Sequence, residues 1–170
     1  MPRAKRRTSA AEIRPARPED LPALARLGAK LAREHHAMDA ARFFLPEEPI
    51  EDGYAWWLGK ELKNRRAAVL AAERRGRVIG YAYGRLEPRD WSTLRDAGGE
   101  AVDLWVEPGA RGAGLGGRLV EALAAALEAR GAERVVLHVA SRNPEARRLF
   151  RRLGFRPTML EMTRERGASR

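Results

Sequence analysis

The stretch AVDLWVEPGARGAGLGGRLVEALAAALEARG, residues 101–131, decides the fold of this chain. An apolar run at 101–106 predicts a strand, which a connection rich in Pro and Gly follows. From about Gly114 to Arg130 leucines recur every four residues without a breaker, which predicts an amphipathic helix. The first amides of a helix lack partners and lie at the positive end of its dipole. We therefore predict a site for a phosphorylated group at residues 111–116.

Three explanations of the glycine-rich turn compete. An incidental strand–helix connection is the weakest of them, because residues 109–117 contain five glycines. A dinucleotide-binding turn is the second, since Gly112, Gly114 and Gly117 fit G-x-G-x-x-G. It lacks the carboxylate expected about 20 residues on, at the end of the next predicted strand. A Walker loop is excluded, because neither Lys-Ser nor Lys-Thr follows the glycines.

The third explanation is a resemblance. The pattern R-x-x-G-x-G, complete here from Arg111 to Gly116, resembles the acetyl-CoA pyrophosphate loop of the GNAT superfamily of N-acetyltransferases. Downstream, residues 143–155 resemble the family's N-x-x-A-x-x-L-[YF]-x-x-x-G-F helix. The resemblance is strong over about 100–157 and extends less closely back to residue 11.

This resemblance implies an α/β fold (three-layer α+β). Its mixed, mostly antiparallel central sheet contains a parallel, splayed central strand pair, and helices cover both faces. The residue patterns agree and predict strands at 11–15, 67–73, 78–86, 101–106, 133–139 and 156–163. They predict helices that begin at Pro18 and Asn143, and two more at 49–64 and 114–130. We expect one domain at 11–165, between a disordered basic tail at 1–10 and a frayed end at 166–170.

Composition narrows the class of protein. The chain of 170 residues has no cysteine, which excludes a disulfide framework and a thiol nucleophile. No apolar run approaches membrane-spanning length and no apolar segment follows the basic start, so we expect a cytoplasmic protein without membrane contact. The net charge of +10 suits an anionic ligand. Nucleic acid is a weak candidate partner, because no motif supports it.

Two clusters of charged residues allow more than one explanation. His35 and His36 are adjacent, so on a helix they point about 100° apart and do not share a metal; we predict no metal site. The acidic segment 47–52 begins a predicted helix. Its carboxylates either relieve the helix dipole or attract a cationic acceptor, and the sequence leaves both open.

By resemblance, the chain transfers the acetyl group of acetyl-CoA to a primary amine by direct attack within a ternary complex. The thioester oxygen gains charge during attack, and the family meets it with a main-chain N–H on the central strand. The residues implied to bind acetyl-CoA lie on that strand, the loop and the downstream helix: Trp105, Val106, Arg111, Gly112, Ala113, Gly114, Leu115, Gly116, Asn143, Ala146 and Phe150.

The acceptor amine must lose a proton, and two carboxylates near the central strand are candidate general bases. Asp103 is preferred over Glu100, because a carboxylate within an apolar strand needs a reason to be there. Strand alternation places the two on opposite faces unless a β-bulge intervenes. A structural carboxylate or a dimer contact remains the competing explanation for Asp103.

One residue departs from the family pattern. Many members have a tyrosine, thought to protonate the leaving thiolate, where this chain has Phe150. Ser141 is a weak alternative acid. The departure keeps open a second function, a non-catalytic domain that binds acetyl-CoA or another acyl-CoA. The acceptor is not identified, and because homodimers are common in this superfamily a second copy is a candidate partner.

Overall fold

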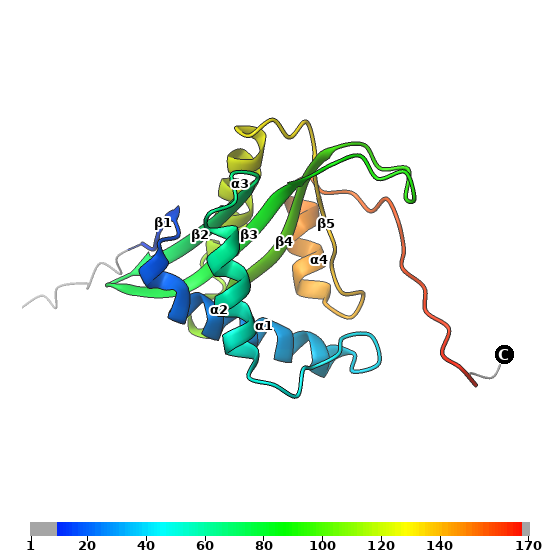
Figure 1. Cartoon of the computed structure of the whole chain (residues 1–170), viewed down its shortest axis with the longest axis horizontal. Coiled ribbons are helices and arrows are strands. Elements are labelled where there is room, and N and C mark those ends of the chain that lie inside the picture. Colours follow the sequence, from blue (N-terminus) through cyan, green and yellow to red (C-terminus); the bar gives the residue numbers. More distant parts are fainter. Residues whose placement is uncertain (1–9, 168–170) are drawn as a thin grey trace, which may run out of the picture.

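The computed structural model describes residues 10–167, which form one five-stranded sheet between two layers of helices (Figure 1). The strands lie in chain order: β1 (Glu12–Pro15), β2 (Ala67–Arg74), β3 (Arg77–Glu87), β4 (Gly98–Val106) and β5 (Val135–Leu137). All neighbouring pairs are antiparallel except β4 and β5, which are parallel. This architecture confirms the predicted fold class. The predicted N-terminal tail lies outside the described residues except for residue 10.

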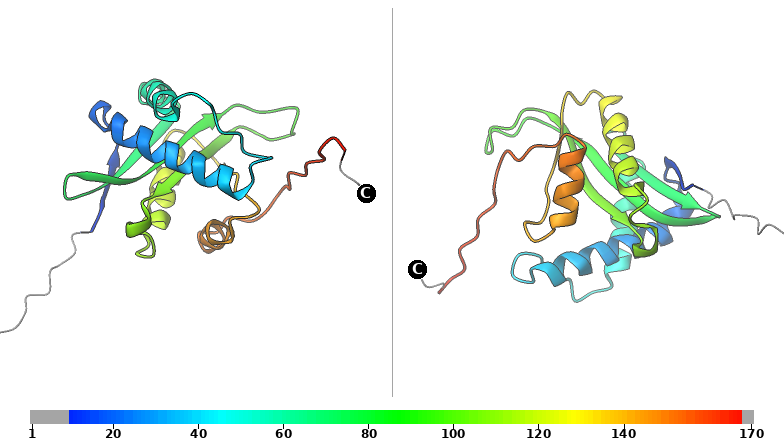
Figure 2. Two further views of the ribbon diagram at one scale, coloured as in Figure 1. Left: turned by 90° about the horizontal axis from the view of Figure 1, so that it is seen from below. Right: turned by 180° about the vertical axis from the view of Figure 1, so that it is seen from behind.

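Helices cover both faces of the sheet (Figure 2). On one face lie α1 (Leu21–Met38) and α2 (Ile50–Glu61), and on the other lie α3 (Leu115–Glu128) and α4 (Pro144–Arg152). Alternate residues of β3 pack into two separate hydrophobic cores, one on each face of the sheet. Tyr81 and Tyr83 pack with the leucines of α1 and α2, while Ala82 packs against α3. The two helix layers therefore hold opposite faces of one strand pair.

A β-bulge interrupts the pairing of β3 with β4. Tyr83 pairs with Asp103 but the next residue, Gly84, pairs with Ala101, so Val102 is an extra residue in β4. The backbone comes close here, since a Cβ added at Gly84 would lie 2.6 Å from the Glu100 carbonyl oxygen. Glycine is therefore required opposite the bulge.

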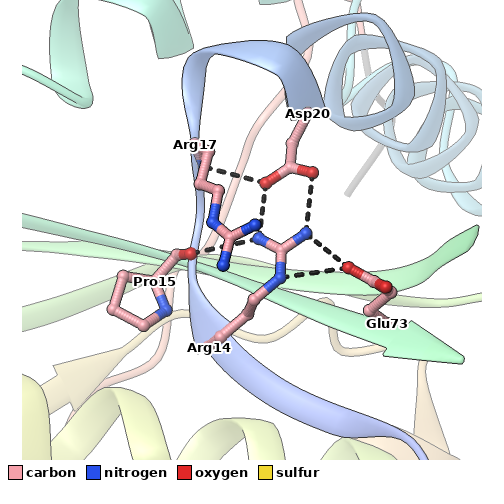
Figure 3. A network of polar contacts seen from close by, with 5 residues as sticks. All are labelled: Arg14, Pro15, Arg17, Asp20 and Glu73. Carbon is pink, nitrogen blue, oxygen red and sulfur yellow. Dashed lines mark hydrogen bonds and ion pairs between the residues drawn. The ribbon is translucent and has the colours of Figure 1, made fainter. Parts of the chain in front are cut away.

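An ion-pair network joins β1, β2 and the start of α1 (Figure 3). The Arg14 guanidinium donates to both carboxylate oxygens of Asp20, at 2.7 and 2.9 Å, and to Glu73 at 2.6 Å. Asp20 is buried and also accepts the main-chain N–H of Arg17 at 2.8 Å. It thereby holds the short 3₁₀ turn η1 (Pro18–Asp20) from which α1 continues.

Four predicted elements differ from the structure. The strand predicted at 101–106 begins three residues earlier, at Gly98. The helix predicted at 49–64 is shorter, Ile50–Glu61, and the strand predicted at 133–139 pairs only at Val135–Leu137. The final strand predicted at 156–163 is wrong for this chain. That segment contains no regular structure, because no strand of residues 10–167 pairs with it.

Candidate functional site

The site is a cleft at the point where β4 and β5 part. The two strands pair only over Gly99–Ala101 and Val135–Leu137, and β4 then continues alone to Val106 on that side. A cleft of about 460 Å³ opens beyond the pairing, lined by parts of α1, β4, the glycine turn, the segment after β5, and α4. This volume lies within the range of pockets that bind small ligands.

The glycine-rich turn forms the end of the cleft nearest α3. After the 3₁₀ turn η2 (Pro108–Ala110), Gly112 and Gly114 have φ of 82° and 77°, in the left-handed region that glycine enters without strain. Gly114 is the N-cap of α3, and Leu115 and Gly116 form its first turn and line the cleft. The unpaired amides of a helix start therefore belong to the cleft, as the anion-site prediction required.

Arg111 lines the cleft and is tied back to the protein. Its Nε donates to the Val106 carbonyl at 2.9 Å, and its Nη2 donates to Glu34 at 3.1 Å. Its guanidinium lies 4.7 Å above the Trp105 ring. The indole N–H of Trp105 is buried and has no acceptor within residues 10–167. Arg111 therefore fixes the junction between β4 and α1 at the side of the cleft.

Helix α4 forms the opposite wall, and its start is built as predicted. The Asn143 side chain accepts the Ala146 N–H at 3.0 Å, which confirms the predicted N-cap. Asn143, Ala146 and Phe150 all line the cleft. Phe150 meets Phe155 edge to face, with ring centroids 6.0 Å apart.

Asp103 is the buried carboxylate of the cleft. Its residue surface is only 9% exposed, and it faces the cleft from β4. Tyr81 donates to its Oδ2 at 2.7 Å. Burial raises the pKa of Asp103 to about 6, against the smaller lowering effect of the Tyr81 hydrogen bond. A carboxylate with this pKa is mostly ionised at pH 7 and can accept a proton.

The bulge decides how Glu100 lies relative to Asp103. Glu100 pairs with Arg85 and Asp103 pairs with Tyr83, two residues along β3, so both carboxylates face the same side of the sheet. The expected opposite placement therefore does not hold. Glu100 does not line the cleft, however, and lies 3.1 Å from His138 and 3.6 Å from Arg95.

Two other predicted site residues lie outside the cleft lining. Ala113 is exposed at the tip of the turn, and Ser141 is exposed before α4, where its carbonyl accepts from Arg147. The acidic segment 47–52 also contributes nothing to the lining, and Glu51 pairs with Arg33 at 2.9 Å.

The cleft contains residues of α1 that the sequence reasoning did not assign. Glu34 and His35 line it near the C-terminal end of the helix. His35 stacks on Phe43 with centroids 4.9 Å apart, and burial lowers the pKa of its imidazole below 6.5. His35 lies four residues after Leu31, so it continues the leucine stripe of α1, and that spacing was the signal available in the sequence.

Residues 10–167 lack two features, a membrane-spanning helix and a cluster of metal ligands. They contain no helix long and apolar enough to cross a membrane. In that part of the chain, no group of three or more His, Cys, Asp or Glu side chains is arranged to hold a metal ion.

A family model described as "Acetyltransferase (GNAT) family" matches residues 31–155, which include the whole cleft. The chain belongs to this family. The chain is similar to the mycothiol acetyltransferase of Salinispora tropica, with 34% identity over 108 residues, which are 58% of this chain and 34% of that protein. The chain spans between 23% and 36% of the length of eight curated relatives, all of them mycothiol acetyltransferases.

Solved GNAT structures show the same fold. A GCN5-related N-acetyltransferase from Ralstonia eutropha JMP134 is 25% identical, with a TM-score of 0.69 over 92% of this chain and 99% of that one. Aminoglycoside N-acetyltransferase AAC(6')-Iy, solved in complex with CoA, is 19% identical, with a TM-score of 0.76 over 96% and 99%. The second likeness is one of fold alone.

Proposed function

We propose that this GNAT chain is an N-acetyltransferase that moves the acetyl group of acetyl-CoA to a primary amine. One observation carries the proposal: the glycine turn at the start of α3, the unpaired length of β4 and the buried Asp103 all border a single cleft. Family membership supports the reaction class. The match covers only 34% of the mycothiol acetyltransferase of Salinispora tropica, so we do not propose mycothiol chemistry for this chain.

The cleft residues fit acetyl-CoA in two ways. The amides of Leu115 and Gly116, at the positive end of α3, suit the pyrophosphate. The main chain of β4 from Asp103 to Val106 has no strand partner on the β5 side. Its N–H and C=O groups on that side can therefore hydrogen-bond the amide groups of an extended pantetheine arm. Acetyl-CoA supplies the activated acetyl group. The chain binds and orients the two substrates and removes the proton from the amine.

The chain's chemical task is to deprotonate the acceptor and to meet the charge of the thioester oxygen. The amine nitrogen forms a bond to the carbonyl carbon, the C–S bond breaks, and the sulfur leaves with the electron pair. The amine proton passes to Asp103, whose raised pKa suits acceptance near neutral pH. A main-chain N–H near Trp105 and Val106 meets the oxygen. Because the leaving thiol has a pKa of about 8.5, its thiolate can leave without a general acid. Phe150, which cannot donate a proton, is therefore compatible with the reaction.

We propose a cationic acceptor, because Glu34 and Asp103 face the cleft from opposite elements. An amine that arrives protonated is attracted by both carboxylates and loses one proton to water before it attacks. The second proton, which the nitrogen releases on attack, is the one that passes to Asp103. Because acetyl-CoA is a metabolite of the cell interior, we propose the cytoplasm as the compartment. We also propose a second copy of this chain as a partner.

Calorimetry with acetyl-CoA tests the donor site. We expect binding by the wild type and its loss in the double variant Arg111→Glu, Gly114→Val. Arg89→Glu is the matched charge control, because Arg89 is exposed on the β3–β4 turn, outside the cleft lining. A wild type that binds neither acetyl-CoA nor a longer acyl-CoA contradicts the proposal.

An amine panel then separates the two candidate functions. Release of free CoA that depends on an added amine establishes the transferase. Tight acetyl-CoA binding with no release for polyamines, aminoglycosides, amino acids or peptides would support the non-catalytic acyl-CoA-binding domain. Phe150, in place of a tyrosine, is the observation that favours this second candidate.

A further inference from the structure

The guanidinium of Arg111 occupies a cation site that the chain itself forms. Its Nη2 lies 3.1 Å from a carboxylate oxygen of Glu34, and its central carbon lies 4.7 Å from the centroid of the Trp105 ring. All three residues line the cleft. A carboxylate beside the face of an indole ring is a combination that binds guanidinium and ammonium groups. Arg111 therefore shows which kind of group fits between Glu34 and Trp105.

The ion pair between Arg111 and Glu34 can be exchanged for another. The two side chains are 38% and 36% exposed. An ion pair in contact with water contributes little free energy, so another cation can replace the arginine. A separate pair, in which Lys30 donates to both carboxylate oxygens of Glu107, also ties α1 to the segment after β4. The guanidinium can therefore leave Glu34 while α1 stays attached to that segment.

Acetyl-CoA offers Arg111 a second partner. Arg111 begins the glycine turn, and the amides of Leu115 and Gly116 at the start of α3 follow it within five residues. The pyrophosphate proposed for these amides carries more negative charge than the single carboxylate of Glu34. Binding of the donor therefore draws the guanidinium away from Glu34, whose carboxylate becomes available to the acceptor.

The position between Glu34 and Trp105 lies beside the proposed base. Trp105 and Asp103 pair with alternate residues of β3, so both side chains face the same side of the sheet. Residues two apart in a strand are separated by roughly 7 Å. A cation at this position is not opposed by the neighbouring His35, because burial lowers the pKa of that imidazole and keeps it neutral at pH 7.

We propose that Glu34 and Trp105 form a second cation site for the acceptor, and that the acceptor is an aliphatic diamine. The inference rests on the proposed acetyl transfer. One amino group reacts at Asp103, while the other stays protonated and replaces the Arg111 guanidinium between Glu34 and Trp105. A chain of about four or five carbon atoms separates two nitrogens by a similar distance. Each substrate favours the departure of Arg111 from Glu34, so each strengthens binding of the other.

Two acceptors with the same carbon chain test the substrate class. Cadaverine has an amino group at each end of the chain, and pentylamine has one. In the wild type we expect kcat/KM to be about 20-fold higher for cadaverine, because its second ammonium pairs with Glu34. Glu34→Gln should remove this preference by slowing cadaverine alone. A wild type without the preference, or a preference that Glu34→Gln leaves intact, overturns the proposal.

Glu51→Gln is the matched charge control. Glu51 belongs to the acidic segment 47–52, pairs with Arg33 at 2.9 Å and lies outside the cleft lining. The preference for cadaverine should persist in this variant. Loss of the preference in Glu51→Gln would mean that the overall negative charge of this region selects the diamine, which overturns the assignment to Glu34.

Calorimetry with CoA, which has no acetyl group to transfer, separates this inference from the proposed function. Glu34→Gln should bind CoA about threefold more tightly than the wild type, because Arg111 no longer leaves a carboxylate. Cadaverine should strengthen CoA binding by the wild type and not by Glu34→Gln. Unchanged or weaker CoA binding by Glu34→Gln overturns the exchange of Arg111, even where acetyl transfer is observed. If no amine is acetylated, the proposed reaction fails, while these affinities still decide whether the second cation site exists.

Discussion

The hydroxyl of Tyr81 on β3 donates a 2.7 Å hydrogen bond to Oδ2 of Asp103 on β4. Both side chains are buried beneath α1 and α2. Burial raises the pKa of Asp103, while the hydrogen bond favours its ionised form and lowers it. In the proposed reaction, the balance near 6 lets this carboxylate serve as a base at neutral pH.

Asp103→Asn should reduce kcat/KM for amine acetylation roughly 10²- to 10³-fold, because an amide accepts no proton from the acceptor. In the wild type, kcat/KM should rise with pH through about 6, as the carboxyl ionises. The variant should lack that rise. Steady-state rates of CoA release from pH 5 to 9 measure both effects.

Glu100→Gln is the control for that substitution. Glu100 faces the same side of the sheet but lies outside the cleft lining and is paired with His138 and Arg95. Its loss should change kcat/KM less than tenfold. If Glu100→Gln proves the more damaging of the two, Asp103 is not the base.

Tyr81→Phe should move the acidic limb of the rate profile to higher pH. The variant loses the hydrogen bond that lowers the pKa of Asp103, while burial still raises it. Activity at pH 9 should stay close to that of the wild type. Tyr54→Phe is the matched control, because Tyr54 is half-buried against the same core but makes no hydrogen bond to Asp103. An unmoved limb in Tyr81→Phe contradicts the role given to the pair.

The raised pKa of Asp103 also makes stability depend on pH. A pKa raised from 3.8 to about 6 means that the folded state holds this proton more tightly than the unfolded state. The stabilisation is complete below pH 3.8 and is lost as pH rises through about 6. Removing the ionisable group should therefore stabilise the fold at pH 8, by about 3 kcal/mol at most. Urea unfolding of the wild type and of Asp103→Asn at pH 3 and pH 8 measures the difference, which should be near zero at pH 3.

Gly114→Ala should weaken acetyl-CoA binding about tenfold. The φ of 77° costs a residue with a Cβ about 1–2 kcal/mol, so the turn relaxes away from the shape that presents the α3 amides. Gly109→Ala is the control, since that position has ordinary φ and open space around an added Cβ. Calorimetry on both variants decides; equal affinities would mean that the turn geometry does not matter for the donor.

Arg14→Met should lower the free energy of unfolding by about 3 kcal/mol, because it leaves the buried Asp20 without its partner. Arg14 also lowers the pKa of Asp20, so that stabilisation is present above pH 3.8 and is lost as pH falls through the lowered value. Arg89→Met removes an exposed pair with Asp96 and should leave the free energy of unfolding almost unchanged, because water screens the pair. Equal losses in urea unfolding would show that burial of the network is unimportant.

The parts of the site that follow from local chemistry could be read from the sequence. Asn143 caps α4 through its own side chain, and Gly114 allows the φ of the turn by lacking a Cβ. Neither depends on distant residues. The assignment of Asp103 to the cleft also followed from one local fact, a carboxylate within an apolar run.

The parts that depend on pairing between strands could not be read in this way. The extra residue Val102 is visible only in the register of β4 against β3, and it reverses the expected facing of Glu100. The 156–163 segment has a strand-like sequence, but a strand also needs a neighbour, which residues 10–167 do not supply. His35 lines the cleft because of the way α1 packs across the sheet. In the sequence, only its spacing of four residues from Leu31 indicated that it shares the buried face of the helix.

The parting of β4 from β5 has a consequence for how such a chain can change. A donor held by main-chain groups is recognised by atoms that every residue except proline shares. In the proposed function, side chains of α1 on the acceptor side of the cleft can then be replaced while the main-chain contacts to the donor persist. The two halves of the reaction become separable targets for redesign: new acceptors are sought by varying Glu34, His35 and their neighbours, with the glycine turn and the open edge of β4 left as they are.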